Sequence, residues 1–125
     1  MPASTTPEIS NRDGVTVIGL GVEYENLDEH LLDKLREVML EVARTADPPL
    51  VVLDLSNTKF FGSAFIEILF GLASCLQARE GQFALCGLTP YCREVLTITH
   101  LDSLWPIFPK REEAVSALRK QAAGS

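Results

Sequence analysis

The architecture of the chain follows from one segment, residues 50–69, which reads LVVLDLSNTKFFGSAFIEIL. Its uninterrupted apolar run at residues 50–53 is typical of a parallel strand that is buried on both faces, and this strand ends near Asp54. A polar loop follows at residues 56–59, and the apolar residues beyond it predict a helix from Ser63 to Ala78. The segment therefore predicts a central strand and a helix that packs against it.

Upstream of this segment, two further signals are clear. Residues 9–20 hold two short apolar stretches around Asn11-Arg12-Asp13-Gly14, and the Asp-Gly pair predicts a β-hairpin. Asn26 is then predicted to cap a helix, with Glu29 at its third position. Apolar residues recur at spacings of three and four up to about Ala43, and the Ala-Asp-Pro-Pro break at residues 46–49 separates this helix from the central strand.

Downstream, the alternation of strand and helix recurs in shorter form. A strand is predicted at residues 82–86, a cap at Thr89 followed by proline, and a short helix at residues 91–98. An edge strand is expected at residues 105–108 and a closing helix at residues 112–121. The order β-β-α-β-α-β-α-β-α predicts one α/β domain, with four helices on a mixed, mainly parallel sheet of about five strands. We expect this domain to span residues 8–121, after a disordered arm at residues 1–7.

The composition limits the classes of partner and compartment. The chain has 125 residues, of which 46% are apolar and 22% charged, as in a single soluble domain. Its net charge of -6 would repel phosphate backbones, so we expect no nucleic acid partner. No apolar run approaches the roughly 20 residues of a membrane helix, and the first ten residues lack an apolar leader. We therefore expect a cytoplasmic protein with no membrane insertion.

Patterns typical of enzymes and metal sites are not evident. Neither His30 nor His100 has a second histidine at ligand spacing, and the glycines form no phosphate-binding loop motif. The three cysteines, Cys75, Cys86 and Cys92, lack CxxC spacing and lie in apolar or helical stretches, which favours structural thiols. We expect no catalytic residue, no metal site and no resident cofactor.

Ser63 follows Gly62 at the start of the apolar helix, and its hydroxyl suits two roles. As an N-cap it would accept a bond from a free helix amide, and physical chemistry alone favours this role. As a phosphoacceptor it would add a charge of about -1.5 to -2 at the positive end of the helix dipole. Ser56 and Thr58 are the alternative acceptors in this loop.

The same helix carries a second feature. Glu67, Gly71, Ser74 and Ala78 are spaced by four, three and four residues, so they share one small and polar face. This face is either the solvent side of the helix or a surface that another protein's backbone approaches closely. In the second case, a phosphate on Ser63 would lie at the rim of the docking surface and penalise binding.

The same residues carry a resemblance to a known family. Residues 51–56, Phe60, Ser63 and residues 66–69 are similar to the signature of STAS domains, specifically of the bacterial anti-sigma factor antagonist type. The resemblance continues at residues 81–88, 95–96, 100–101 and 112–115. It covers residues 8–119 in the same order of elements, and Asp54 corresponds to the aspartate that ends the family's central strand.

The resemblance implies a regulator without catalytic activity. In this family, the serine that matches Ser63 is phosphorylated by an anti-sigma factor that is also a serine kinase and binds the ATP. Unphosphorylated antagonist binds the kinase and frees the sigma factor; phosphorylation ends the binding and a phosphatase restores it. Together with the polar helix face, the resemblance predicts a partner-binding surface made of Asp54, Ser56, Asn57, Thr58, Gly62, Ser63, Glu67, Gly71 and Ser74.

Two positions next to Ser63 depart from the family pattern, and the acidic residue usual after the second strand is matched only by Glu23 or Glu25 nearby. Gly62 stands where the family usually has aspartate, and Phe65 stands where it usually has glycine. Loss of the Asp-Ser pair favours an alternative function, the STAS accessory subunit of a lipid or solute ABC transporter, which binds its ATPase without phosphorylation. A third alternative, an enzyme or small-ligand carrier, has no cluster of residues behind it.

Overall fold

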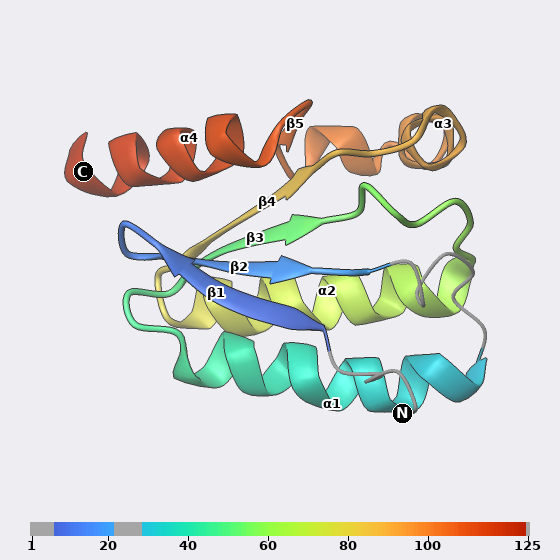
Figure 1. The fold of residues 1–125 in the computed structure, drawn as a ribbon, viewed down its shortest axis with the longest axis horizontal. Coiled ribbons are helices and arrows are strands. Elements are labelled where there is room, and N and C mark those ends of the chain that lie inside the picture. Colours follow the sequence, from blue (N-terminus) through green and yellow to red (C-terminus); the bar gives the residue numbers. More distant parts are fainter. Residues whose placement is uncertain (1–6, 22–28, 125) are drawn as a thin grey trace.

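The computed structural model describes residues 7–21 and 29–124, which form one β-sheet with helices on both faces (Figure 1). The strands are β1 (Glu8–Arg12), β2 (Val15–Gly19), β3 (Leu50–Asp54), β4 (Gln82–Cys86) and β5 (Ile107–Phe108). The helices are α1 (Glu29–Thr45), α2 (Ser63–Ala78), α3 (Pro90–Ile98), the short 3-10 helix η2 (Leu101–Ser103) and α4 (Arg111–Gly124). The predicted fold class and order of strands and α-helices are confirmed, while Asn26 and residues 1–6 of the expected arm lie outside the described residues.

The sheet has the order β1-β2-β3-β4-β5, and it is mixed. Strands β1 and β2 pair antiparallel through the predicted hairpin, whereas every other neighbouring pair is parallel. The hairpin turn places Asp13 and Gly14 at φ values of 57° and 92°, and the Gly14 amide donates to Asn11 Oδ1 at 3.0 Å. The Asp-Gly signal thus corresponds to a turn that needs two positive φ angles.

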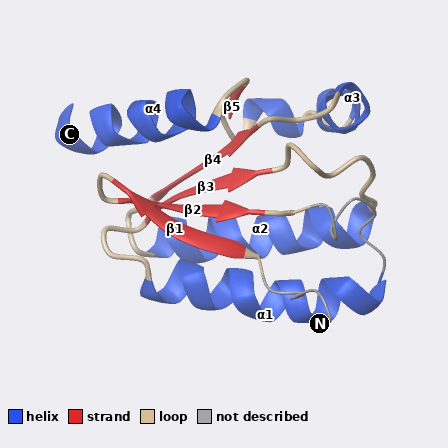
Figure 2. Cartoon of the chain, in the orientation of Figure 1, coloured by secondary structure: helices blue, strands red, loops and turns tan. Residues whose placement is uncertain are grey.

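Each face of the sheet is covered by a separate group of helices (Figure 2). The side chains of Ile18, Leu53 and Leu85 face α1 and α2 and belong to the larger apolar cluster. Those of neighbouring strand positions pack with α4 in a smaller cluster, whose members include Val17, Val52, Ala84, Ala114 and Leu118. All five residues of β3 are buried, as the apolar run predicted for a strand covered on both sides.

The predicted edge strand at residues 105–108 is too long, because only Ile107 and Phe108 form β5. The Trp105 amide donates to the carbonyl of Leu101 at 3.3 Å, so Trp105 belongs to the turn after η2. Its ring also lies 5.1 Å from the ring of Phe70 and is buried. Pro106 has no N-H to donate to a strand ladder, which explains why pairing begins only after it.

Among the described residues, no helix is both long enough and apolar enough to cross a membrane.

Candidate functional site

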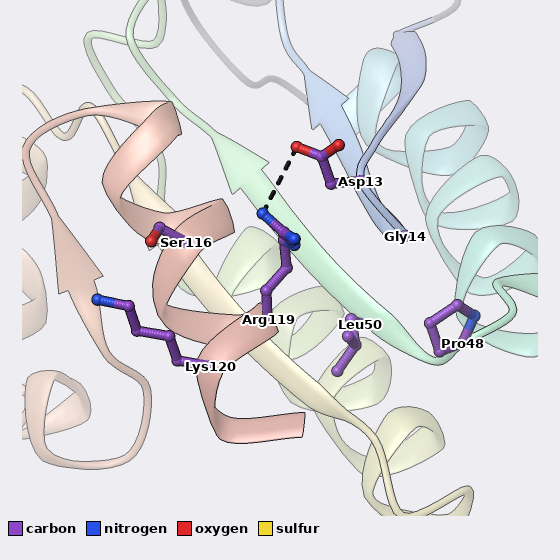
Figure 3. Close-up of a pocket in the computed structure, with 7 residues that line it drawn as sticks. All are labelled: Asp13, Gly14, Pro48, Leu50, Ser116, Arg119 and Lys120. Carbon is purple, nitrogen blue, oxygen red and sulfur yellow. Dashed lines mark ion pairs between the residues drawn. The ribbon is translucent and has the colours of Figure 1, made fainter. Parts of the chain in front are cut away.

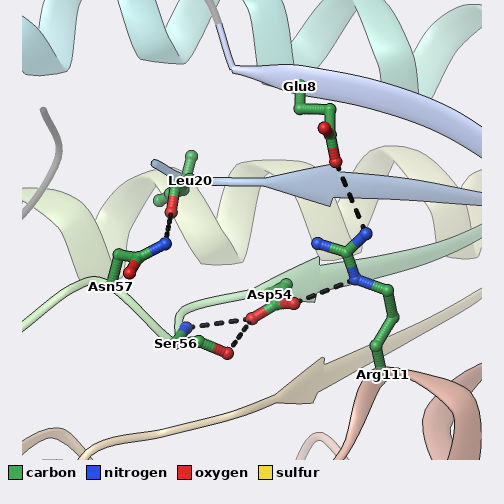
Figure 4. Close-up of polar contacts among 6 residues, drawn as sticks. All are labelled: Glu8, Leu20, Asp54, Ser56, Asn57 and Arg111. Carbon is green, nitrogen blue, oxygen red and sulfur yellow. Dashed lines mark hydrogen bonds and ion pairs between the residues drawn. The ribbon is translucent and has the colours of Figure 1, made fainter. Parts of the chain in front are cut away.

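The polar loop after β3 begins at Asp54, whose buried carboxylate has two separate sets of partners (Figure 4). Asp54 Oδ1 accepts hydrogen bonds from the backbone N-H of Ser56, at 2.9 Å, and from the Ser56 hydroxyl. This is an Asx-type turn, in which a side chain fixes the backbone two residues further on. Asp54 Oδ2 accepts from Arg111 Nε at 2.9 Å. The carboxylate therefore joins the start of the loop to α4.

Arg111 is the first residue of α4, and its guanidinium also reaches β1, where Nη1 lies 3.4 Å from Glu8 Oε1. Burial by itself lowers the pKa of Arg111. The hydrogen bond and the charge of Asp54, together with those of Glu8, raise the pKa by more than burial lowers it. The net result is a pKa above the usual value of arginine, so the guanidinium stays charged.

The middle of the loop is fastened to two other elements. Asn57 Nδ2 donates to the carbonyl of Leu20, just beyond β2, at 3.2 Å. The Thr58 carbonyl accepts from Thr89 Oγ1 at 3.4 Å and from Cys92 Sγ at 3.5 Å. Thr89 is the predicted cap of α3, and its hydroxyl also accepts from the Cys92 amide. The loop is therefore fixed by the end of the sheet on one side and by the start of α3 on the other.

Aromatic residues surround the end of the loop. Phe60 and Tyr91 stack with ring centroids 5.6 Å apart, and each is about half exposed. Phe61 is buried, with its ring centroid 5.1 Å from that of Phe65. Phe65, which stands in place of the family's usual glycine, therefore fills the core below α2 and does not project from the loop.

Ser63 is exposed, but it is not the N-cap that physical chemistry alone favoured. The cap residue is Gly62, with φ -116° and ψ -167°, and no side-chain bond caps the helix. The carbonyl of Gly62 already accepts from the amides of Phe65 and Ile66, so Gly62 is the cap and Ser63 is the first residue of α2. The hydroxyl of Ser63 thus projects from the first turn of α2, where helix amides are free of intrahelical partners.

The predicted polar face of α2 is confirmed as an exposed face, since Glu67, Gly71, Ser74 and Ala78 are all exposed. A Cβ atom at Gly71 would lie 3.6 Å from Leu40 Cδ2, so α1 approaches the helix at this point. Glu67 is one turn beyond Ser63, which makes the face continuous with the first turn of α2.

The expected partner-binding residues therefore separate into two groups. Asp54 and Thr58 are buried and hold the loop in place. The others are exposed or half-exposed, and they are Ser56, Asn57, Gly62, Ser63, Glu67, Gly71 and Ser74. Sequence reasoning missed Arg111, because 57 residues separate it from Asp54 and no local pattern links the two. It also missed the exposed aromatic pair of Phe60 and Tyr91, which stand in separate elements.

The three cysteines are free thiols. Burial raises the pKa of Cys86 to about 12, and the neighbouring Asp54 carboxylate adds to the effect. Burial also raises the pKa of Cys92. These two thiols therefore stay protonated at neutral pH and act as small apolar side chains. No group of histidine, cysteine, aspartate and glutamate suited to a metal ion occurs in residues 7–21 and 29–124.

Comparison with known proteins gives consistent matches over most of the chain. The profile of the STAS domain matches residues 6–114. The anti-sigma F factor antagonist of Paenibacillus polymyxa is 26% identical over 111 residues, which cover 89% of this chain and 92% of that protein. The structure of an anti-sigma-factor antagonist (STAS) domain protein from Planctomyces limnophilus is 34% identical, with a TM-score of 0.86, and covers 91% of this chain and 98% of the other. An anti-sigma factor antagonist from Mycobacterium paratuberculosis has 26% identity and a TM-score of 0.78, over 95% of this chain and 99% of the other.

Proposed function

The chain belongs to the STAS domain family, and from this premise we propose that it is an anti-sigma factor antagonist that binds an anti-sigma factor kinase and is switched by phosphorylation of Ser63. Anti-sigma factor antagonists of this family are regulators without enzymatic activity. The observation that carries the proposal is the exposed hydroxyl of Ser63 in the first turn of α2, next to an exposed polar face of the same helix.

Access to the hydroxyl favours Ser63 over the other two candidate acceptors. Thr58 is fully buried, so a kinase cannot reach its hydroxyl without opening the loop. Ser56 is exposed, but its hydroxyl donates to Asp54, and a phosphate there would be placed against that carboxylate. Ser63 is exposed, and its hydroxyl is not bonded to a carboxylate in the described part of the chain. A phosphate on it would face helix amides and the positive end of the helix dipole, which oppose the repulsion from Glu67 one turn away.

The switch follows from where the added charge lies. Unmodified, the first turn and polar face of α2 present three small residues, Ser63, Gly71 and Ser74, beside the exposed Glu67. The small residues let a partner approach the helix closely. Phosphorylation would add about -1.5 to -2 charge at the rim of this surface, and binding would then have to desolvate that charge. The partner would supply the ATP, and a phosphatase would return the antagonist to its binding form. We place this exchange in the cytoplasm.

The first test is a phosphorylation assay with the anti-sigma factor kinase of the same organism and ATP. We expect intact-mass analysis to show one phosphoryl group on the wild type and on Ser74→Ala, a matched control for an exposed serine of α2. Ser63→Ala should remain unmodified. A phosphate that persists in Ser63→Ala would assign the modification elsewhere, and an unmodified wild type would favour the accessory transporter subunit.

A second variant separates the fold from binding. Ser63→Asp should keep the circular dichroism spectrum of the wild type, because an acidic residue in the first turn of a helix contributes about 0.3–1 kcal/mol of favourable dipole interaction. Calorimetry should show weaker binding to the kinase, since the carboxylate has to be desolvated at the interface. Equal affinity of the wild type and Ser63→Asp would refute the charge switch.

A further inference from the structure

The position of the polar loop after β3 depends on a contact with α4 at the end of β3, on the face of the sheet that α4 covers. α4 covers the face opposite to α1 and α2, and its first residue, Arg111, binds the carboxylate from which the loop begins. We propose that Arg111 is a positioning residue for the partner-docking segment, residues 55–63, because its guanidinium fixes Asp54 in the orientation that organises the turn at Ser56. The binding part of this inference rests on the proposed function, whereas the positioning part concerns the isolated protein.

The two carboxylate oxygens of Asp54 bind different partners. Oδ2 is bound by Arg111 Nε, and this leaves Oδ1 directed at the amide and hydroxyl of Ser56 (Figure 4). The side chain of Arg111 is 21% exposed and that of Asp54 is 12% exposed, so water competes little for the contact. A shielded, charge-assisted bond of this kind restrains a carboxylate more strongly than an exposed ion pair does.

Two glycines make room for the network. A Cβ atom at Gly19 would lie 2.9 Å from Arg111 Nη2 and 3.4 Å from Glu8 Oε1. On the other side, Gly87 has φ +69°, and a Cβ atom there would overlap Ser56 Oγ and approach Asp54 Oδ1 to 3.0 Å. The absence of a side chain at Gly19 therefore leaves space for the guanidinium of Arg111. The absence of one at Gly87 leaves space for the turn at Ser56.

The network fixes the loop at its first turn. The Ser56 amide donates to Asp54, the Asn57 side chain donates to Leu20, and the Thr58 amide donates to the Leu55 carbonyl at 3.0 Å. Without Arg111, the buried Asp54 carboxylate loses its charged partner and is free to rotate toward water. The Ser56 amide then loses a fixed acceptor, and the loop that leads to Ser63 loses its starting orientation.

The test combines two perturbations with a matched control. Arg111→Gln removes the charge but leaves Asp54 unpaired, which also lowers overall stability. Gly19→Ala keeps the arginine, but its Cβ atom would lie 2.9 Å from Arg111 Nη2, so we expect the guanidinium to shift away from Asp54 while the backbone of β2 stays in place. Arg119→Gln is the control, because Arg119 lies on the same helix and pairs with Asp13 at 3.6 Å (Figure 3). Asp13 lies in the turn before β2, whereas Gly19 at the end of β2 is the residue that pairs with Asp54.

Amide hydrogen exchange of the isolated protein is the primary readout. We expect Arg111→Gln and Gly19→Ala to accelerate exchange of the Ser56 and Thr58 amides at least fivefold relative to the Leu50 amide. The Leu50 amide is the reference because it donates to the carbonyl of Pro48, at the other end of β3. Arg111→Lys should restore part of the protection, and Arg119→Gln should leave it unchanged. Exchange at Ser56 and Thr58 that follows Leu50 in every variant would overturn the proposal, because Arg111 would then act only on global stability.

Binding to the anti-sigma factor kinase is the second readout. Gly19→Ala should lower the affinity about fivefold or more, with a melting temperature close to that of the wild type. Unchanged affinity in a variant with a loosened loop would overturn the link from Arg111 to docking. Failure of the proposed function is recognised separately, because Ser63→Asp would then bind like the wild type whatever the exchange rates show.

Discussion

The N-cap position of α2 and the exposed hydroxyl at its start belong to two different residues, Gly62 and Ser63. Ser63 offers an exposed hydroxyl, whereas the residue at the N-cap has no side chain with which to bond the first amides of α2. Aspartate at the cap, the residue usual in the family, would satisfy one of these amides. With glycine there, the amides of the first turn stay available to a phosphate on Ser63.

The first prediction concerns this cap. Gly62→Asp should raise the free energy of unfolding by about a few tenths of a kcal/mol, because aspartate caps slightly better than glycine. The site has room, since a Cβ atom at Gly62 meets nothing within 4 Å, and its φ of -116° suits any residue. Urea denaturation measures the change, with Gly62→Ala as the control that adds the Cβ atom without the carboxylate and should destabilise α2.

The same variant bears on phosphorylation. The Gly62→Asp carboxylate would occupy the helix amides and repel a phosphate on Ser63, so phosphorylation should stabilise the variant less than the wild type. Thermal melts of both proteins, before and after modification, make the comparison. An equal gain in both proteins would show that the first-turn amides do not bind the phosphate.

At the residue level, local chemistry determined what could be predicted. The places of Asp54 at the end of a buried strand and of Ser63 at the start of an apolar helix could be predicted from the sequence, because each stands next to a clear change of structure. The capping role of Ser63 was wrong by one residue, since helix boundaries depend on φ and ψ angles that composition does not fix. Arg111 is a long-range partner, so only the assembled fold reveals its position next to Asp54.

At the level of elements, α2 serves the core and the surface at once. Phe65, Leu69 and Leu72 are buried, while Gly71 and Ser74 on the other side are exposed. Glycine in the middle of a helix costs stability relative to alanine, so its presence at an exposed position calls for a reason. A close approach of the partner to the helix backbone is that reason in the proposed function.

The second prediction tests this face with two substitutions at one position. Gly71→Ala should stabilise the protein by about 0.5–1 kcal/mol, because alanine favours the helix and its Cβ atom would make an ordinary contact with Leu40. Gly71→Arg should also keep the helix but weaken binding to the kinase, since a long charged side chain would stand between the partners. Calorimetry and urea denaturation measure both effects, and an affinity of Gly71→Arg equal to that of Gly71→Ala would argue against docking at this face.

Element boundaries were predicted best where burial is strongest. The expected limits of α2 and β4 agree with the structure, because an apolar run enclosed by polar residues marks where the element begins and ends. The limits of β5 were wrong, since tertiary contacts of Trp105 override its strand propensity. Short edge elements carry too few residues for a pattern to define them.

At the scale of the whole molecule, the sheet separates two cores of unequal size. The α1 and α2 side contains Trp105, and the α4 side contains Leu118, which is fully buried. Arg111 begins the same helix as Leu118 and binds Asp54 at the end of β3, on the same face of the sheet. Packing of α4 is therefore a condition for the loop geometry at the proposed docking site.

The last prediction is that these two cores unfold together. Leu118→Ala should lower the free energy of unfolding by about 2–5 kcal/mol, through lost apolar burial and the cavity left behind. Leu104→Ala is the matched control, because Leu104 is 57% exposed and its truncation should change stability by less than about 0.5 kcal/mol.

Far-ultraviolet circular dichroism follows all helices, whereas Trp105 fluorescence follows the opposite core. Domains of this size usually unfold in one step, so we expect both signals of Leu118→Ala to share one urea midpoint, below that of the wild type. A Trp105 transition that stays at the wild-type midpoint while the circular dichroism signal falls earlier would mean that α4 detaches alone, and the contact of Arg111 with Asp54 would then be lost before the rest of the fold.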